Sequence, residues 1–472
     1  MRITVIGGGP GGYTAAFEAA RRGHAVTLVE NGFLGGTCLN RGCIPTKTLR
    51  SSADVLELAS RLTAYGVSGC PQPEMDLAAL RRRKESVINI LREGLEKTCA
   101  RLKVTQLRGT GRVRSAASVL VDGEDGHREV AGDAVILATG SRVLELPGLI
   151  FDHEHICSSD DALELKRIPR RLVIVGGGVI GCEMACIYRA LGSEVIVIEG
   201  QDRLLPMPGI DRDVSALLGR EFRKQKIRQL TGRTLAQVTV TDGTVRGVAE
   251  ASPFAPEPGG KVAPETLEAD MVLVTVGRSP STGGLGLAEA GVAVDRRGWI
   301  TVDERLQTSV PGIYAVGDIL GPSHVMLAHV AAAEAGCVVD GLCGMPRAMR
   351  YNAVPSAIFT APEIGAVGLD EDQARARGGR VVCGVTQMRE LGKAQAMNEL
   401  AGFFKIVADA ENGAVLGASI VGAHATDMIA EAGLALSAGL GVRQVAESIH
   451  AHPTLAEGLG DAAAAALRGM EA

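Results

Sequence analysis

Two cysteines stand five positions apart in the segment GGTCLNRGCIPTK, residues 35–47. Cys38 and Cys43 could belong to a metal site, a structural bridge or a working redox pair. An ideal helix rises about 7.5 Å over five residues, whereas a disulfide needs Cα atoms about 4.4–6.8 Å apart. A bridge between them therefore requires a turn or a distorted first helical turn, which the neighbouring glycines permit. Pro45 stands where a helix start tolerates it.

A redox disulfide is the interpretation that these residues favour over zinc. A helix N-terminus at this place would stabilise the thiolate released on reduction and lower its pKa. Structural zinc needs four paired Cys or His ligands, and no second CxxC-type pair appears in the sequence. The remaining cysteines, including Cys182 and Cys186, are expected to be small buried hydrophobic residues.

Dithiol–disulfide exchange also needs a base that titrates near neutrality, to deprotonate the incoming thiol and to return protons later. The segment HAHPTLAE offers His450 and His452, with Glu457 downstream. A histidine by itself is more often structural than catalytic, so the residues alone leave this assignment open.

The start of the chain has the pattern of a dinucleotide-binding unit. Residues 2–6 (RITVI) form an apolar run, Gly7, Gly9 and Gly12 follow it, and an alanine-rich helix begins there. A second apolar run ends at Glu30. The glycines would permit a tight turn and a close approach of the backbone. The helix N-terminus would face a pyrophosphate, and Glu30 would accept hydrogen bonds from a ribose.

The same pattern recurs in a later segment, where Gly176, Gly178 and Gly181 follow a strand and Glu199 ends the next one. Two such units predict two bound dinucleotides, a flavin and a nicotinamide. In the second site Glu199 favours a free 2′-hydroxyl over a 2′-phosphate, and hence NAD over NADP. Arg203, four residues on, argues in the other direction.

Three further segments have the pattern of buried strands closed by small residues: DAVILATGS (133–141), DMVLVTVGRSP (270–280) and PGIYAVGD (311–318). Asp318, at the end of the last one, could hydrogen-bond polar groups of a cofactor or cap the helix that follows. The Pro- and Gly-rich segment 251–265 is expected to be an exposed loop, to which we assign no function.

The composition is that of a globular protein with several domains. The chain has 472 residues, 46% of them hydrophobic, and a formal net charge of -5, which argues against disorder and against a nucleic-acid partner. No apolar run is long enough to span a bilayer, and the chain opens on a strand instead of a signal peptide. We expect a cytoplasmic protein whose ten cysteines are mostly reduced. The basic run Arg81 to Lys84 is expected to lie on a solvated helix face.

In this order the motifs resemble the flavoprotein disulfide reductases, from the first residue almost to the last. The segments that carry the resemblance are GGTCLNRGCIPTK, ILATGS, GGGVIGCE, YAVGD, MLAH (326–329), VPSAIFTAPEIGAVGL (354–369) and IHAHPTLAE (449–457). Within that family the chain looks most like the members that oxidise dihydrolipoyl groups. The resemblance implies an α/β fold with two Rossmann-like dinucleotide-binding domains and a C-terminal α+β dimerisation domain. The expected domains are 1–145 for FAD and the redox disulfide, 146–275 for NAD, 276–345 as a central domain that completes the FAD site, and 346–472 for dimerisation.

The resemblance also implies which residues hold the cofactors, with FAD in the first site, NAD in the second and no metal. Gly277 matches a position near NAD. Lys47 would sit near the flavin and pair with Glu183, and its positive charge would stabilise the reduced, anionic flavin. The other positions that match FAD contacts are Gly36, Thr37, Gly111, Thr139, Gly140, Ser141, Asp318, Met326, Leu327, Ala328 and His329.

The function that the resemblance implies is an electron relay. A dihydrolipoyl group on a separate carrier protein would give a proton to His452, oriented by Glu457, and its thiolate would attack Cys38. Cys43, packed on the flavin, would pass the electrons to FAD, and the reduced flavin would transfer a hydride to NAD. His452 would reach the thiols from the partner subunit, so a homodimer would be obligatory.

Three residues depart from the family pattern, although none of them removes a catalytic group. Thr46 stands where a serine is usual, Val330 where a lysine is usual, and Asp427 where a glutamate is commoner. The last departure bears on the geometry of the dimer interface.

Related enzymes and a non-enzymatic flavoprotein are the alternatives. A glutathione-reductase-like enzyme would usually place an aromatic residue at Val179 and basic residues near Glu199. A mercuric-reductase-like enzyme would carry a second cysteine pair in its tail, which this tail lacks. A binding module would have no need of an intact thiol pair and an intact histidine–glutamate pair. The motifs do not distinguish between multienzyme complexes or between the two directions of the reaction.

Overall fold

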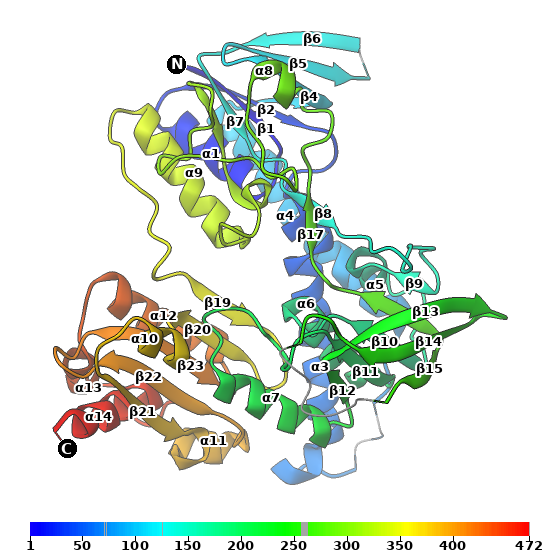
Figure 1. Cartoon of the computed structure of the whole chain (residues 1–472), viewed down its shortest axis with the longest axis vertical. Helices are drawn as coiled ribbons and strands as arrows, with labels where there is room; N and C mark the ends of the chain where they lie inside the picture. The colour runs from blue at the N-terminus through cyan, green and yellow to red at the C-terminus, as the bar shows by residue number, and fades with distance from the viewer. Residues whose placement is uncertain (70, 72, 125, 256–262, 472) are drawn as a thin grey trace.

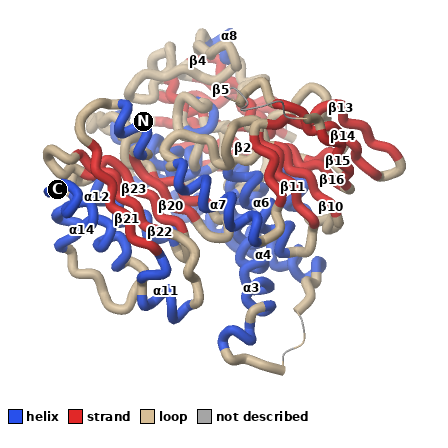
Figure 2. The backbone as a smooth tube through the Cα atoms, turned by 60° about the horizontal axis from the view of Figure 1, so that its bottom comes forward, coloured by secondary structure: helices blue, strands red, loops and turns tan. Residues whose placement is uncertain are grey.

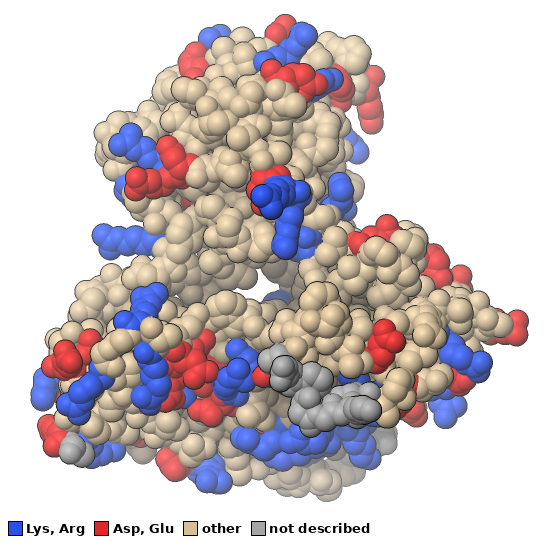
Figure 3. Space-filling view, in the orientation of Figure 1, with Lys and Arg blue, Asp and Glu red and all other residues tan. Residues whose placement is uncertain are grey.

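The computed structural model describes residues 1–472 except 70, 72, 125, 256–262 and 472. The described residues form three lobes (Figure 1). The upper lobe contains both the blue N-terminal part and a yellow-green part from the middle of the chain. Below it lie a green lobe and an orange-to-red lobe that carries the C-terminus. The space-filling view is hollowed where the three lobes meet (Figure 3).

The first lobe is built on a parallel sheet to which two distant parts of the chain contribute. Its strands, in spatial order, are β18 (Ile313–Ala315), β7 (Ala134–Leu137), β1 (Arg2–Ile6), β2 (Ala25–Glu30) and β3 (Thr105–Arg108). The strands are largely apolar because other elements pack against the sheet. Helices α1 (Pro10–Arg21) and α9 (Ala328–Leu342) pack against each other beside it. Two short helices, α8 (Leu287–Ala290) and η2 (Gly317–Leu320), complete this lobe.

The second lobe repeats this arrangement. Its parallel sheet has the order β12 (Arg228–Thr231), β11 (Glu194–Glu199), β10 (Arg171–Val175), β16 (Met271–Val274) and β9 (Ile156–Cys157). Three helices accompany it: α5 (Ser159–Glu164), α6 (Val179–Ala190) and α7 (Arg212–Lys224). Each of the two predicted glycine-rich units therefore lies between the central strand of a five-stranded sheet and a helix.

Small antiparallel sheets extend both lobes and connect them. One contains β4 (Thr110–Ser115), β5 (Ser118–Gly123) and β6 (Gly126–Ala131), and another contains β13 (Arg233–Thr241), β14 (Thr244–Ala251) and β15 (Glu265–Ala269). The two-stranded ribbon of β8 (Ser141–Val143) and β17 (Arg278–Pro280) lies between the lobes (Figure 1). Of the expected loop 251–265, the central residues 256–262 lie outside the described residues.

A pair of long helices runs from the first lobe past the second. The chain passes from α2 (Gly36–Arg41) into α3 (Cys43–Ser60), then through η1 (Leu62–Tyr65) to α4 (Leu77–Leu102), which packs on α3 (Figures 1 and 2). The expectation for the basic run on α4 is wrong at one position. Arg81 to Arg83 are exposed, but Lys84 is buried and its Nζ donates to the carbonyl of Leu163 at 2.9 Å. A lysine can be buried when its ammonium finds such an acceptor.

The C-terminal lobe has an antiparallel sheet with helices packed on it (Figure 2). The strand order is β19 (Pro355–Ile358), β20 (Ile364–Gly368), β23 (Val415–Val421), β22 (Phe403–Asp409) and β21 (Val381–Gln387). Its helices are α10 (Glu371–Ala376), η3 (Met388–Glu390), α11 (Gly392–Met397), α12 (Ala425–Ser437), α13 (Val442–Glu447) and α14 (Glu457–Glu471). The predicted fold class, two dinucleotide-binding units and a C-terminal α+β unit, is confirmed. Among the described residues, no helix is both long and apolar enough to cross a membrane.

Candidate active site

The two cysteines of the GGTCLNRGCIPTK segment come together across a break between two helices. Cys38 lies on α2, and Cys43 is the first residue of α3. Gly42 between them leaves the helical conformation, with φ -146° and ψ -111°. The distorted turn that a close approach requires is therefore present. The two thiols are free and close enough to shift each other's pKa values, with Cys38 half-buried and Cys43 exposed.

The environment of the pair makes Cys43 the more acidic thiol. The hydrogen bond from Cys38 and the positive charge of Lys47 lower the pKa of Cys43 to about 7. That hydrogen bond and burial raise the pKa of Cys38 well above its usual range. Because Cys43 also begins an 18-residue helix, the positive end of the helix dipole favours a thiolate at this position.

An ion pair with a buried carboxylate holds the cation beside Cys43. Lys47, one helical turn along α3, donates to Glu183 Oε1 at 3.0 Å and to Glu183 Oε2 at 2.8 Å. The Glu183 side chain is 3% exposed, and its Oε1 also accepts the backbone N–H of Phe359 at 2.9 Å. The Lys47 ammonium lies 4.5 Å from the centroid of the Phe359 ring. The pair therefore joins α3, α6 and the segment after β19, where the three lobes meet.

The first glycine loop is shaped by close backbone contacts and leaves one side open. A Cβ on Gly7, at φ +104°, would lie 2.3 Å from the carbonyl oxygen of Ala138, and one on Gly12 would lie 1.7 Å from that of Gly7. Gly9, the N-cap of α1, makes no side-chain cap. Within 4 Å, a Cβ there would meet only the Cα of Gly36, at 3.7 Å, among the described residues. Free N–H groups at a helix start beside open space suit a phosphate.

The second glycine loop has the same construction. A Cβ on Gly176 would lie 2.6 Å from the carbonyl oxygen of Thr275, and one on Gly181 would lie 1.9 Å from that of Gly176. Gly178, the N-cap of α6, has no cap either, and a Cβ there would have no neighbour within 4 Å among the described residues. Both loops therefore offer the same opening at the start of a helix.

The two strand-end acids hold these loops in place. Glu30 accepts the N–H of Gly8 at 2.6 Å, and Glu199 accepts the N–H of Gly177 at 2.6 Å. Each carboxylate oxygen has a second lone pair, so ribose hydroxyls can still be accepted. Arg203 instead donates to the carbonyl of Ile210 at 2.9 Å and to Ser215 Oγ at 2.8 Å. Its guanidinium is thus engaged within the fold.

The predicted FAD positions between β7 and β8, on β8 and on η2 are held by hydrogen bonds. Ser141 Oγ donates to Asp318 Oδ2 at 2.7 Å, and Thr139 Oγ1 donates to the carbonyl of Ser281 at 2.8 Å. The alternative role of Asp318 as an N-cap is wrong, because Val316 is the N-cap of η2 and no side chain caps it. Gly140, at φ +70°, faces open space, as expected where a ligand approaches.

The remaining predicted cofactor positions are distributed around this group. Gly36 lies against Gly9, because a Cβ on Gly36 would lie 2.6 Å from the Cα of Gly9. Thr37 follows Gly36 on α2. Gly111 is pressed against Ile6, where a Cβ would lie 2.8 Å from Cγ2, so packing alone explains this glycine. Met326 is half-buried, Leu327 is the uncapped N-cap of α9, and Ala328 is the first residue of that helix. The Nε2 atom of His329 lies 3.0 Å from the carbonyl oxygen of Pro355. Gly277 has a φ of +140° and lies beside β17.

Sequence reasoning missed two charged residues that support the same group. Arg278 Nε donates to Ser141 Oγ at 2.5 Å and lies 3.7 Å from Asp318 Oδ2. Glu334, 1% exposed, accepts the N–H of Gly317 at 2.6 Å, and burial raises its pKa. The sequence marked Arg278 only indirectly, because this residue directly follows Gly277, a predicted cofactor position. It gave no such sign for Glu334.

The candidate base is paired with its carboxylate in the C-terminal lobe. His452 Nδ1 lies 2.8 Å from Glu457 Oε1, and Glu457 Oε2 accepts the N–H of Thr454 at 2.8 Å. The hydrogen bond from His452 lowers the pKa of Glu457. His450 instead pairs with Glu431 on α12, at 2.9 Å. The His452 side chain is 77% exposed, and no hydrogen bond among the described residues joins it to either thiol of the same chain.

Comparison with known proteins identifies the family. The family model described as pyridine nucleotide-disulphide oxidoreductase matches residues 1–335, and the model of the dimerisation domain of the same family matches residues 354–463. The dihydrolipoyl dehydrogenase of Haloferax volcanii is 40% identical over 468 residues, which cover 98% of this chain and 96% of the relative.

Two solved structures have the same fold over nearly the whole chain. LpdA from Mycobacterium tuberculosis superposes with a TM-score of 0.89 at 27% identity, covering 98% of this chain and 99% of its own. The HOCl-induced flavoprotein disulfide reductase RclA from Escherichia coli has a TM-score of 0.85 at 28% identity, covering 98% and 99%. The likeness to the relatives and to both structures extends through all three lobes, and the chain belongs to the pyridine nucleotide-disulphide oxidoreductase family.

Proposed function

We propose that this protein is a dihydrolipoyl dehydrogenase. It would oxidise dihydrolipoyl groups of a carrier protein to lipoyl disulfide and pass the electrons through Cys38, Cys43 and FAD to NAD. The observation that carries the proposal is the thiol pair at the start of α3, with the Lys47–Glu183 pair beside Cys43. The full-length likeness to a dihydrolipoyl dehydrogenase supports the substrate class.

The residues present suit two dinucleotides. Both glycine loops leave open space at an uncapped helix start, and both have a carboxylate at the end of the following strand. We assign FAD to the first loop because the thiol pair adjoins it through Gly36. We assign NAD to the second because Glu199 accompanies it and Arg203 is engaged elsewhere. When bound, FAD would supply two-electron redox chemistry and NAD would be the hydride acceptor.

The protein's own residues perform the thiol chemistry. In the oxidised enzyme Cys38 and Cys43 share a disulfide. His452 of the partner subunit takes the proton of a substrate thiol, and the resulting thiolate attacks Cys38 Sγ. The Cys38–Cys43 bond breaks, and Cys43 leaves as a thiolate, which the helix start and Lys47 stabilise. The second substrate thiol then attacks the substrate sulfur of the mixed disulfide and passes its proton to Cys38, which leaves as a thiol as lipoyl disulfide is released. Glu457 orients the imidazole and stabilises its cation.

The match to the family's dimerisation domain indicates a homodimer. A shared active site agrees with an exposed His452 that makes no hydrogen bond to a thiol among the described residues of its own chain. The domain limits 1–145, 146–275, 276–345 and 346–472, the separate lipoyl carrier protein and the cytoplasmic location stay predictions. A reductase of another disulfide is the second candidate function, because RclA has the same fold.

The test is a steady-state assay of nicotinamide reduction by dihydrolipoamide, with NAD and NADP in parallel. We expect turnover with NAD that Cys43→Ser abolishes and His452→Gln reduces strongly. If dihydrolipoamide gives no turnover while NADPH is oxidised with another disulfide, the substrate and the role of Glu199 are wrong.

A further inference from the structure

A buried lysine joins the second lobe to the C-terminal lobe, outside the site described above. Lys405 on β22 is 2% exposed. Its ammonium lies 2.8 Å from Asp211 Oδ2 and 2.8 Å from Asp213 Oδ2, both at the start of α7. It also lies 2.7 Å from Glu371 Oε2 on α10. The three protons of the ammonium therefore meet three carboxylates from two lobes.

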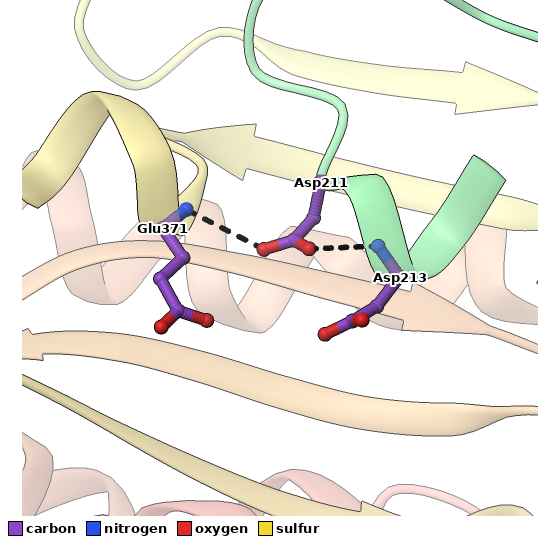
Figure 4. A group of neighbouring side chains, drawn as sticks. All are labelled: Asp211, Asp213 and Glu371. Carbon is purple, nitrogen blue, oxygen red and sulfur yellow. Dashed lines mark hydrogen bonds between the residues drawn. The ribbon is translucent and has the colours of Figure 1, made fainter. Parts of the chain in front are cut away.

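The three acids converge on one point (Figure 4). The Asp211 carboxylate lies in the middle and accepts the N–H of Asp213 at 3.0 Å and that of Glu371 at 3.4 Å. Three carboxylates so close together have the composition of a cation site, and the Lys405 ammonium is the cation in contact with all of them.

The charges in this cluster depend on one another. Burial alone would lower the pKa of Lys405, but its hydrogen bonds to Asp211, Asp213 and Glu371 raise it above the usual value. Lys405 and Arg375 lower the pKa of Glu371 to about 2. Lys405 and Glu371 are thus both charged at neutral pH. Loss of the lysine would leave the buried carboxylate of Asp211 without its ammonium partner, which is costly.

One segment connects this cluster directly to the second glycine loop. Residues 200–211 run from Glu199 to Asp211. Near its start, the N–H of Gln201 donates to Glu199 Oε1 at 2.7 Å, and the N–H of Leu205 donates to the carbonyl of Gly177 at 2.8 Å. At its end, Asp211 is held by Lys405. The C-terminal lobe therefore holds one end of a segment whose other end supports the nucleotide loop.

We propose that Lys405 is a positioning residue for the second nucleotide site. By holding Asp211, it keeps the segment 200–211 in the conformation in which Glu199 and the glycine loop meet the nucleotide. This inference rests on the proposed NAD site, and it makes the affinity for NAD depend on the contact between the two lobes.

Two variants and a control test the proposal. Asp211→Asn removes the negative charge that pairs with the Lys405 ammonium and so weakens this contact. The variant keeps the N-cap of α7, because Asn and Asp cap helices equally well. Lys405→Met removes the ion pair with Asp211 completely. Arg212→Met is the matched control, because Arg212 pairs with Asp372 at 3.2 Å across the same contact and with Asp202 at 3.1 Å within the second lobe, but is exposed. Exposed pairs contribute little.

The measurements are the KM for NAD, the affinity for NADH, and flavin reduction by dihydrolipoamide in the absence of nucleotide. We expect Asp211→Asn and Lys405→Met to raise the KM for NAD by about tenfold or more, since small misplacements in an oriented site have effects of this size. Flavin reduction by dihydrolipoamide should be unchanged in both variants, and Arg212→Met should leave all three quantities unchanged.

The outcomes separate this inference from the function on which it rests. Wild-type protein that binds no NAD would overturn the proposed function. Wild-type protein that binds NAD, together with an Asp211→Asn variant of unchanged KM, would overturn the role of Lys405 alone. An equal loss in nucleotide binding and in flavin reduction would show a general structural effect and would also overturn it. If Lys405→Met does not fold, Asp211→Asn decides.

Discussion

Lys47 Nζ lies 2.8 Å from Glu183 Oε2, one helical turn after Cys43. The ion pair fixes a positive charge beside the thiol at the start of α3. Its position is set by three lobes, because Glu183 belongs to α6 and is also held by the N–H of Phe359. The acidity of Cys43 is therefore a product of the tertiary structure as well as of the local helix.

Replacing Lys47 should make Cys43 less acidic. In the wild-type protein the thiolate of Cys43 forms as the pH rises through about 7. Lys47→Met removes a charge that lowers this pKa, so the midpoint should move to higher pH. The measurement is the pH dependence of Cys43 alkylation in the reduced protein, followed peptide by peptide by mass spectrometry. Lys97→Met, in an exposed pair with Glu93, is the control and should leave the midpoint in place.

Mixed dimers should show that the base acts across the subunit interface. The homodimers of Cys43→Ser and of His452→Gln should both have very low activity, because a general base contributes about 10²–10⁴-fold. A heterodimer of the two has one site with intact thiols from one subunit and an intact histidine from the other. Co-expression should therefore restore activity. If His452 served the thiols of its own chain, the heterodimer would stay inactive.

Two glycines of the second loop should respond differently to alanine. A Cβ on Gly178 meets nothing within 4 Å among the described residues, whereas one on Gly181 would lie 1.9 Å from the carbonyl oxygen of Gly176. Gly178→Ala should therefore fold with a nearly unchanged melting temperature but bind NADH weakly, because the methyl group occupies the space proposed for the pyrophosphate. Gly181→Ala should lower the melting temperature. Unchanged NADH binding by Gly178→Ala would contradict the proposed location of the nucleotide.

Acid should weaken the Lys405 cluster in a defined range of pH. The pKa of Glu371 is lowered from 4.5 to about 2 in the folded protein, mainly by the hydrogen bond from Lys405. A lowered pKa contributes stability above the unfolded value, which is lost as the pH falls from about 4.5 towards 2. Thermal unfolding in this range should show a weaker pH dependence for Glu371→Gln than for the wild-type protein. Glu93→Gln, on an exposed side chain, should behave like the wild-type protein.

The sequence by itself determined the features that depend on residues close together in the chain. The five-residue spacing of Cys38 and Cys43 with Gly42 between them, and the glycine loops with a carboxylate at the end of the next strand, are local patterns. Their conformations follow from steric rules for short segments, which a single sequence carries. These patterns predicted the two nucleotide-binding units, and the family resemblance carried by the order of all the motifs implied the C-terminal unit.

For charged residues outside the motifs, only the tertiary structure decided which of them are buried and which residues they pair with. Lys84, Glu334 and Lys405 have nothing in their sequence surroundings that marks them as internal, and Lys84 was expected on a solvated face. Their partners lie far away in the chain: Leu163 for Lys84, and Asp211 for Lys405. A buried charge is tolerated only when folding brings a partner within hydrogen-bonding distance. Whether this condition is met depends on how the lobes pack against one another, and local sequence patterns carry no information about that packing.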